Sequence, residues 1–235
     1  MKIAIMQPTF LPWLGYFSLI KSVDKFVFLD DVQFDRRSWQ QRNYILNNNK
    51  PLLLTVPVIK KGKMDQPINC VALDNSSSFK KKHLASFRHA YSKAPFKKTA
   101  FELLKLTYEE DITLLSDFNI SLISNIINYL DIKTEIICSS SLGLGGEKTD
   151  RLINICVALG CTKYVSVKGS SAYLEHEQFQ ENNIELNYFR FISSQNIKLT
   201  NSLNLSTMHY INEHNLDFFS SLDEFEHVAQ LAELA

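Results

Sequence analysis

The chain has 235 residues, a length that suits one α/β domain with elaborations. Its 25 lysines and arginines balance its 25 aspartates and glutamates, so no overall field draws it to nucleic acid or to an anionic membrane. It begins directly with an apolar run of strand type, without a secretory leader pattern, and lacks a stretch of about 20 apolar residues. We therefore expect a cytoplasmic protein without a membrane span.

Two short apolar runs open the chain. Residues Lys2–Met6 and Lys25–Leu29 predict buried strands, and the apolar residues between Leu14 and Asp24 recur at helical spacing. The first run ends at Gln7-Pro8, because proline lacks an N–H group and holds the preceding residue extended. If the two strands are parallel, residues 7–16 and 30–43 lie at the same end of a sheet, where open α/β folds usually hold ligands.

The middle of the chain interrupts this alternation. Asp31–Arg42 has no clean period and predicts a functional loop, while Leu52–Val58 and Ile68–Leu73 predict further short strands. Three consecutive segments then show helical periodicity: Phe79–Tyr91, Pro95–Leu106 and Ile112–Leu130. We interpret residues 74–131 as a helical insertion or subdomain within a single α/β domain spanning residues 1–235, and Asp74–Ser78 as a capping run before its first helix.

The alternation resumes after the insertion. Glu135–Cys138, Thr162–Val167 and Ile184–Phe191 predict strands, and helices are expected over Thr149–Leu159, within Ala172–Asn182 and over Leu222–Leu234. The predicted fold is therefore α/β, a Rossmann-like parallel sheet of about five strands with a helical insertion.

Polar residues follow several of these strands. Parallel strands would present Gln7, Asp30-Asp31, Ser139–Ser141 and Lys168-Gly169 along one edge of the sheet. Two adjacent carboxylates can share a cation or act in proton transfer, although alternation along the chain directs them to opposite faces. We expect one of Asp30 and Asp31 to enter a pocket and the other to cap or to pair with Arg36 or Arg37.

The run Gly143–Arg151 combines a strand end, a glycine turn and a helix start. Unpaired N–H groups and the helix dipole favour an anion at such a place, so Lys148 and Thr149 are candidate ligand contacts. The run matches neither the G-x-G-x-x-G nor the G-x-x-x-x-G-K-[ST] pattern, and a flexible connection with Thr149 as a helix cap is the alternative.

Three arginines lie within seven residues of the loop before residue 43. Arg36, Arg37 and Arg42 can bind phosphate or carboxylate through two hydrogen bonds each, and Trp39 between them could cover a flat or sugar-like ligand. The alternative is a solvated loop with Trp39 packed on the domain. The six histidines lack a metal-ligand spacing, and no G-x-S-x-G nucleophile elbow occurs.

The amino-terminal motifs resemble those of the WbqC-like protein family of bacteria. The resemblance covers most of residues 1–190 and rests on Gln7–Phe17, Phe28–Phe34, Arg37–Trp39, Gln41–Asn43, Leu54–Pro57, His83–Pro95 and Lys148–Ile153. The chain lacks the proline of a Ser-Gly-Pro element at Val167–Tyr173, and Ile192–Leu205 departs from the usual tyrosine- and proline-containing stretch.

What the resemblance implies is a pathway. Members of the family occur in gene clusters for O-antigen and other surface polysaccharides, and a glycine transferase role has been suggested for one. The expected function is transfer of an acyl or aminoacyl group, such as glycine, to the amino group of a nucleotide-linked amino sugar. In that reaction Gln7 and Asn43 would position the substrate, the three arginines would hold phosphate or carboxylate, and Asp30 or Asp31 would take the amine proton.

A second resemblance concerns Thr9–Tyr16, which is similar to the strand-to-helix motif of nucleotidylyltransferases. The two histidine positions of that motif read Trp13 and Tyr16 here, while Gly15 remains. This leaves two rival functions, a nucleotidylyl or adenylate-forming transferase using ATP or CTP, and a non-catalytic protein that binds sugar nucleotides. The sequence identifies no cofactor and no oligomeric state. The candidate substrate-binding residues are Gln7, Thr9, Trp13, Gly15, Tyr16, Arg36, Arg37, Trp39, Arg42, Asn43, Ser140, Lys148, Thr149 and Lys168.

Overall fold

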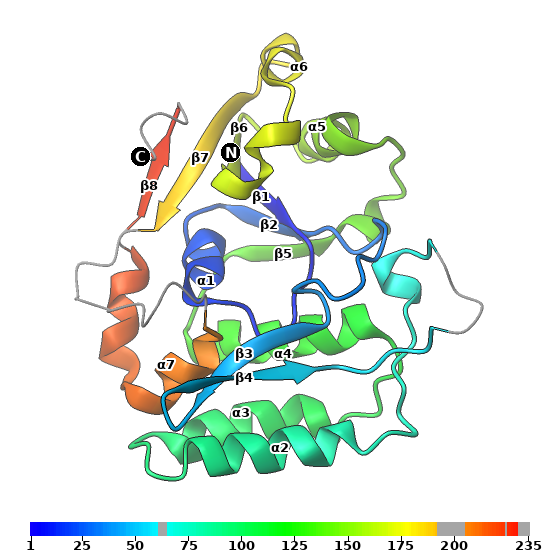
Figure 1. Ribbon diagram of the computed structural model, residues 1–235. Helices are drawn as coiled ribbons and strands as arrows, with labels where there is room; N and C mark the ends of the chain where they lie inside the picture. Colours follow the sequence, from blue (N-terminus) through cyan, green and yellow to red (C-terminus); the bar gives the residue numbers. More distant parts are fainter. Residues whose placement is uncertain (61–64, 192–204, 224, 230–235) are drawn as a thin grey trace.

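The computed structural model describes residues 1–60, 65–191, 205–223 and 225–229 and confirms the α/β class (Figure 1). Its larger sheet has six strands in the order β5-β2-β1-β6-β7-β8. Five of them are mutually parallel, as the sequence predicted, and the last pairs antiparallel with its neighbour. Their bounds are β1 Lys2–Met6, β2 Lys25–Phe28, β5 Glu135–Cys138, β6 Lys163–Val167, β7 Glu185–Phe191 and β8 Phe225–Val228.

The register of the central strands aligns their carboxyl ends. Met6 of β1 pairs with Phe28 of β2, and Phe28 pairs with Cys138 of β5. The residues that follow these strands therefore leave the sheet side by side at one edge. This alignment places the polar segments that begin at Gln7, Asp30 and Ser139 near one another.

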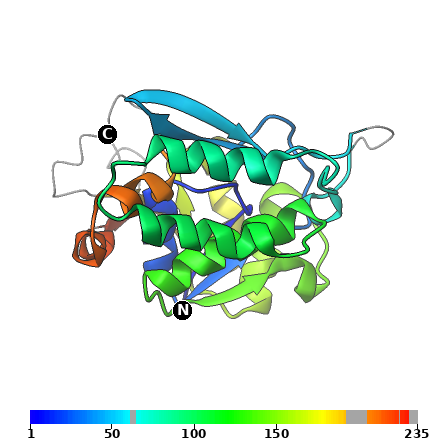
Figure 2. The same ribbon diagram turned by 90° about the horizontal axis from the view of Figure 1, so that it is seen from below.

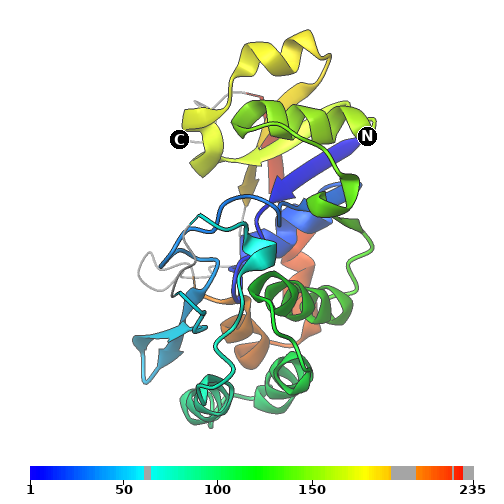
Figure 3. The ribbon, with the colours of Figure 1, turned by 90° about the vertical axis from the view of Figure 1, so that its right-hand side faces the viewer.

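Alternation along the strands gives the sheet two apolar faces. One face, which includes Ala4 and Phe26, packs with α1 (Leu14–Lys21) and α4 (Leu115–Tyr129). The other, which includes Ile3 and Tyr164, packs with α5 (Lys148–Ala158) and α6 (His176–Glu181). Seen from the side, the sheet lies between these two helical layers, as expected for parallel strands that are buried on both faces (Figure 3).

The three helices predicted in the middle of the chain are confirmed. They are α2 (Phe79–Ala90), α3 (Lys97–Glu109) and α4, and the view from below shows their layer beneath an antiparallel hairpin (Figure 2). The hairpin consists of β3 (Arg42–Asn47) and β4 (Lys50–Thr55), so the strand predicted over Leu52–Val58 begins two residues earlier and ends before Pro57. A further helix, α7 (Thr207–Glu213), also belongs to this side. The division of the chain into one domain with an inserted subdomain stays a prediction.

Two local predictions are wrong. Within the predicted strand Ile68–Leu73, Ile68–Cys70 forms a 3-10 turn, in which the N–H of Val71 donates to the carbonyl of Ile68, and Ala72 and Leu73 form only isolated β-bridges. In the stretch expected to be the last helix, Phe225–Val228 is strand β8, where Phe225 and His227 both lie against Phe189 of β7. Hydrogen bonding to the edge of β7 thus favours an extended conformation here, with side chains alternating between the two faces of the sheet.

The predicted capping run Asp74–Ser78 does not cap helix α2 with a side chain, since the N-cap residue Ser78 makes no side-chain capping bond. The irregular stretch Ile192–Leu205 lies outside the described residues except for its last position. Among the described helices, none is both long and apolar enough to cross a membrane.

Candidate active site

Strand β1 occupies the point where the order of the sheet reverses. The connection through α1 places β2 on one side of β1, and the later connection through α5 places β6 on the other side. In open α/β sheets the helices diverge at such a point and leave a crevice at the carboxyl ends of the strands. Adjoining cavities lined by described residues lie at this edge, among them three of about 650, 430 and 120 Å³.

The largest of these, the acid-side cavity, has a volume of about 650 Å³. It lies between the end of β2 and the start of α5. Its lining includes the predicted residues Gln7, Asp31, Lys148 and Thr149. The other lining residues are Leu29, Val32, Gln33, Leu144, Gly145, Gly146, Glu147, Arg151, Leu152, Tyr173 and Leu174.

The second, the tryptophan-side cavity, has a volume of about 430 Å³ and lies over the ends of β1 and β6. Trp39, which is 48% exposed, forms part of its wall together with Thr9 and Ser170. The two larger cavities share the four residues Gln7, Leu29, Leu152 and Tyr173. A third space of about 120 Å³ continues past Trp39 to Trp13, Tyr16 and Asn43. The three spaces therefore form one continuous crevice along the sheet edge.

A hydrogen-bonded polar cluster adjoins the acid-side cavity; we call it the acid–serine–arginine cluster. It consists of Asp30, Asp31, Ser139, Ser140 and Arg151. Asp30 is only 5% exposed, and its carboxylate accepts hydrogen bonds from the backbone N–H of Ser140 at 3.0 Å and from the Ser140 hydroxyl at 2.6 Å. Such donors replace the water that a buried carboxylate loses. Asp30 lines none of the three cavities.

Asp31 is the carboxylate that enters a cavity. The Ser139 hydroxyl lies 2.6 Å from its Oδ1 atom, and the Arg151 guanidinium forms an ion pair with Oδ2. Arg151 also donates to the carbonyl of Leu144, so it ties α5 and the glycine turn to the end of β2. The expectation that one aspartate enters a pocket agrees with this geometry. The ion-pair partner of Asp31 is Arg151, which the sequence did not single out.

The glycine turn between β5 and α5 has the predicted order of strand, turn and helix. Gly146 has a φ of +106°, and a Cβ there would lie 3.1 Å from the backbone nitrogen of Arg151. Glycine is therefore required for the turn to lie this close to the first turn of α5. The turn lines the acid-side cavity, and binding of an anion there stays a prediction.

Thr149 does not cap α5, contrary to one of the two expectations. The N-cap residue is Glu147, and Thr149 lies within the helix, 2% exposed. Its hydroxyl donates to the carbonyl of Tyr173 at 3.0 Å and accepts from the N–H of Glu175 at 3.3 Å. Thr149 thereby fixes the segment that follows β6 against α5.

The space beside Gly15 is filled from within the protein. A Cβ at Gly15 would lie 2.0 Å from the indole ring of Trp13, which meets Phe191 edge-on at 6.0 Å. A ligand in the third space would therefore meet this indole rather than the Gly15 backbone. Tyr16 is buried, which raises the pKa of its hydroxyl well above the usual value, and it donates to the carbonyl of Gln7 at 3.1 Å.

Hydrogen bonds within the crevice hold two further predicted residues. The side-chain oxygen of Gln7 accepts from the Gln40 amide at 2.7 Å, and the Asn43 amide donates to the carbonyl of Leu11 at 2.6 Å. These contacts fix the loops that carry Trp39 onto the end of β1. Rigid support of this kind is what a preorganised binding site needs.

Four of the cationic residues that were predicted to contact a ligand do not line the crevice. Arg36 and Arg37 are exposed on the loop, Arg42 is half-buried at the start of β3, and Lys168 is exposed after β6. None of these four residues lines the three cavities. The cationic side chains that do line them are Lys148 and Arg151. Whether the outer arginines contact a ligand stays a prediction.

The structure also adds residues that sequence reasoning did not assign to the site. Arg151 and Tyr173 line the acid-side cavity, and Tyr173 lines both of the larger cavities. The one available signal for Arg151 was its position in the first turns of a helix directly after a glycine turn. No group of three or more histidine, cysteine, aspartate or glutamate side chains could hold a metal ion within the ranges that the structure describes.

The fold and the crevice define a parallel α/β protein with a candidate ligand site at the switch point of its sheet. The chain belongs to the WbqC-like protein family, whose model matches residues 7–201. It is also similar to the uncharacterized protein Rv1507c of Mycobacterium tuberculosis, with 36% identity over 191 residues, 81% of this chain and 82% of that protein. No solved structure matches.

Proposed function

We propose that this protein transfers an acyl or aminoacyl group, such as glycine, to the amino group of a nucleotide-linked amino sugar in the synthesis of surface polysaccharide. The observation that supports the proposal best is the pair of joined cavities of about 650 and 430 Å³ at the sheet edge. A transfer between two substrates needs two adjoining sites whose reactive groups meet, and binding both in one crevice supplies proximity.

The acid-side cavity suits the amino-sugar nucleotide. Its glycine turn, the start of α5 and Lys148 offer N–H groups and a positive charge to the diphosphate. Asp31, in the same cavity, offers a carboxylate to the sugar ammonium. The tryptophan-side cavity would then hold the acyl donor against Trp39, with Gln7 at the boundary between the two substrates.

The proton on the amine decides whether transfer occurs. An ammonium has no lone pair, so Asp31 accepts one of its protons before the nitrogen attacks the acyl carbonyl. The new C–N bond forms while the bond between the acyl carbon and its leaving group breaks. Ser139 and Arg151 each bind one carboxylate oxygen of Asp31, and each oxygen retains a lone pair for the ammonium.

A nucleotidylyltransferase reaction has less support from the geometry of the crevice. In such an enzyme the nucleotide would approach the Gly15 backbone closely, but here the Trp13 indole occupies that space. A non-catalytic protein that binds sugar nucleotides would use the same crevice without turnover. Because this binding protein differs from the proposed transferase only in the chemistry, the experiment must measure binding and product separately.

Thermal-shift measurements with a uridine-diphosphate amino sugar bearing a free amine test the binding step. Incubation with glycine and ATP, or with a glycyl thioester, followed by mass spectrometry tests the transfer. We expect stabilisation and a sugar nucleotide heavier by one glycyl group. Stabilisation without product would favour the binding protein, and absence of stabilisation by every amino-sugar nucleotide tried would contradict the proposal.

Matched variants locate the binding. Lys148→Gln removes an exposed charge from the acid-side cavity and should weaken nucleotide-sugar binding by about tenfold, because each charge-assisted phosphate contact contributes more than 1 kcal/mol. Lys50→Gln removes an exposed charge from β4, outside the crevice, and should leave binding unchanged. Equal effects of both substitutions would show that the nucleotide binds elsewhere.

A further inference from the structure

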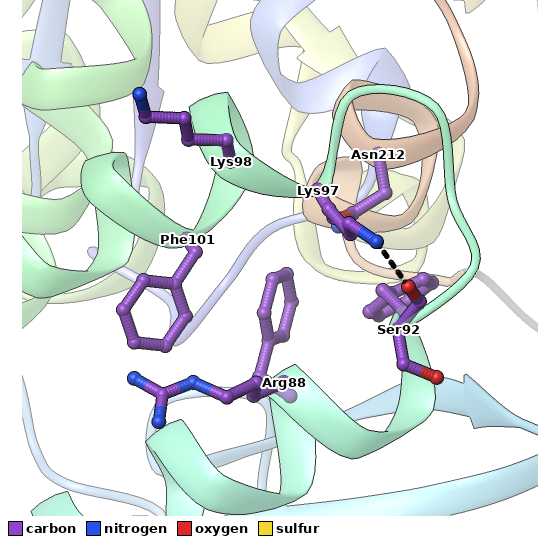
Figure 4. A pocket seen from close by; sticks show the side chains of 8 residues that line it. Arg88, Ser92, Lys97, Lys98, Phe101 and Asn212 are labelled. Carbon is purple, nitrogen blue, oxygen red and sulfur yellow. Dashed lines mark hydrogen bonds between the residues drawn. The ribbon is translucent and has the colours of Figure 1, made fainter.

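The cavities of this protein differ in whether the polar groups along their walls already have partners. A cavity of about 320 Å³ in the helical layer lies at the end of α2 and the start of α3 (Figure 4). There the guanidinium carbon of Arg88 lies 4.6 Å from the centroid of the Phe101 ring, and Lys97 donates to the carbonyl of Ser92. These groups contact one another, unlike the side-chain donor of Gln7 where the two larger cavities of the crevice join.

Two consecutive hydrogen bonds fix the orientation of the Gln7 side-chain amide. The backbone N–H of Asp35 donates to the side chain of Gln40 at 3.0 Å. Because a backbone N–H can only donate, the accepting atom is Oε1 of Gln40, and Nε2 of Gln40 is the atom that lies 2.7 Å from Gln7. An amide nitrogen likewise only donates, so it binds Oε1 of Gln7. Nε2 of Gln7 is therefore on the branch of the amide that Gln40 does not contact.

The Nε2 atom of Gln7 is accessible in the crevice. It donates to none of the described residues, and it is not one of the buried polar atoms that lack a partner, so it retains contact with solvent. Gln7 lines both the acid-side and the tryptophan-side cavity. Of the other residues that line both, Leu29 and Leu152 have apolar side chains, and Tyr173 is 60% exposed. Gln7 thus supplies an oriented donor where two substrates would meet.

We propose that Nε2 of Gln7 binds the acyl carbonyl oxygen and stabilises the oxyanion that forms during transfer, and that Gln40 is its positioning residue. This inference rests on the proposed acyl transfer and assigns the group that receives the developing negative charge. A donor that is oriented in advance stabilises this charge without reorganisation. Gln40, which is 2% exposed, holds the amide in the required orientation.

The transfer step balances with an activated acyl donor such as a thioester. The sugar ammonium gives one proton to Asp31, and the neutral nitrogen attacks the acyl carbon while the π electrons of the C=O bond move to the oxygen. This oxygen then accepts from Gln7. When the C=O bond forms again, the carbon–sulfur bond breaks, and the leaving thiolate takes the second proton from the nitrogen. The products are an amide on the sugar and a thiol, and Asp31 returns its proton to solvent.

A neutral substitution at Gln7 tests the donor. Gln7→Met keeps an uncharged, unbranched side chain of similar size and removes the N–H groups. With a uridine-diphosphate amino sugar and a glycyl thioester, kcat should fall about 100-fold, the usual cost of removing one such donor, while the Kd of the nucleotide sugar changes less than threefold. The control Gln180→Met, at an exposed position of α6 outside the three cavities, should leave both values unchanged. A kcat of Gln7→Met within threefold of wild type would overturn the proposal.

The pH profile of Gln40→Glu tests the positioning role. When protonated, the introduced carboxyl donates to Oε1 of Gln7, as the wild-type amide does. When ionised, it accepts from Nε2 of Gln7 instead, and the turned amide then directs its oxygen toward the substrate carbonyl. Burial raises the pKa of such a carboxyl, so kcat relative to wild type should fall at least tenfold between about pH 6 and about pH 9. The ratio for Gln180→Glu should stay constant, and wild-type activity of Gln40→Glu at both ends of the range would overturn the role of Gln40.

A tetrahedral probe separates a failure of this assignment from a failure of the proposed function. A uridine-diphosphate amino sugar with a methylphosphonyl group on its nitrogen carries an anionic oxygen where the oxyanion forms, whereas the N-acetyl analogue carries a neutral carbonyl there. Wild type should bind the phosphonyl probe at least tenfold more tightly than the N-acetyl analogue, and Gln7→Met should reduce this preference to less than threefold. A Gln7-dependent preference without any transfer product would support the donor and contradict the transfer. A preference that is absent in wild type, or that survives Gln7→Met, would overturn the role of Gln7 even if product forms.

Discussion

Two clusters of interacting side chains in this protein differ in whether they can hold a charge. The acid–serine–arginine cluster at the sheet edge surrounds the buried carboxylate of Asp30 and the half-buried carboxylate of Asp31 with hydroxyl, backbone and guanidinium donors. The second, which we call the histidine cluster, lies in the helical layer and consists of Phe10, Phe79, His83, Tyr108 and Phe118. There the His83 ring has aromatic neighbours and a single side-chain partner, the Tyr108 hydroxyl at 3.0 Å.

The difference follows from the secondary structure around each cluster. Loops that leave parallel strands have free backbone N–H groups, such as that of Ser140, which donates to Asp30. Residues inside helices have already used their backbone groups in the helix. A polar side chain between α2, α3 and α4 therefore depends on other side chains or on a neighbouring strand, as His83 does on Tyr108 and on the backbone of Thr55 in β4. Burial nevertheless lowers the pKa of His83 to about 4. The sheet edge can keep a charge where the helical layer cannot.

The largest expected effect is in the histidine cluster. Phe118 is fully buried, and its ring lies within 5.1 to 6.3 Å of those of Tyr108, Phe79 and Phe10. Phe118→Ala should lower the free energy of unfolding by about 4 kcal/mol in urea denaturation, because it leaves a cavity that these rings cannot fill. Leu106→Ala, at a position 56% exposed, should change it by less than about 0.5 kcal/mol. A small loss at Phe118 would show that the cluster adapts its packing.

The second largest effect on the free energy of unfolding is expected in the acid–serine–arginine cluster. Arg151→Ala leaves Asp31 with the Ser139 hydroxyl but without its counterion, and should cost about 3 kcal/mol in the same measurement. If the cost comes from the uncompensated charge, the double variant with Asp31→Asn should be more stable than the sum of the two single losses predicts. Simple additivity would contradict a direct coupling between the two side chains.

The pH dependence of stability separates the two clusters. The folded state holds His83 neutral, with a pKa of about 4 against 6.5 for an unperturbed histidine, so the unfolded state binds more protons between these values. The contribution of His83 to the free energy of unfolding is complete above pH 6.5 and is lost as the pH falls toward 4. The loss is about 2 kcal/mol between pH 7.5 and 5. His83→Gln should remove this part of the slope. If the free energy of unfolding changed with pH equally in the wild type and the variant, His83 would not be the source of this pH dependence.

The smallest effect on the free energy of unfolding is expected at Asp30, whose carboxylate accepts more than one hydrogen bond. Ser140→Ala removes one hydroxyl bond to Asp30 but leaves the Ser140 N–H in place, and the single proton of the Ser139 hydroxyl lies within reach of both aspartates. The free energy of unfolding should fall by about 1 kcal/mol. Tyr108→Phe, which removes the side-chain partner of His83, should cost more, about 2 kcal/mol. A reversed order of these two values would break the comparison between the clusters.

The sequence by itself determined the five parallel strands of the sheet and the edge where polar residues follow them. Short apolar runs marked the five parallel strands, and Gln7-Pro8 and the glycine turn marked two of the strand ends. These signals are local, because apolar runs, proline geometry and glycine freedom act within a few residues. The family motifs were likewise visible in the chain.

Tertiary structure decided which of these residues meet. The ion pair between Arg151 and Asp31 joins positions 120 residues apart, and the contact of Asn119 with the backbone of Pro8 joins positions 111 residues apart. The same holds for β8, which is extended because the edge of β7 offers it hydrogen bonds. Partners so distant in sequence depend on strand order and helix packing, which no local pattern encodes. The sequence therefore located the crevice, and the packing of α5 onto the sheet decided that Arg151 joins Asp31 there.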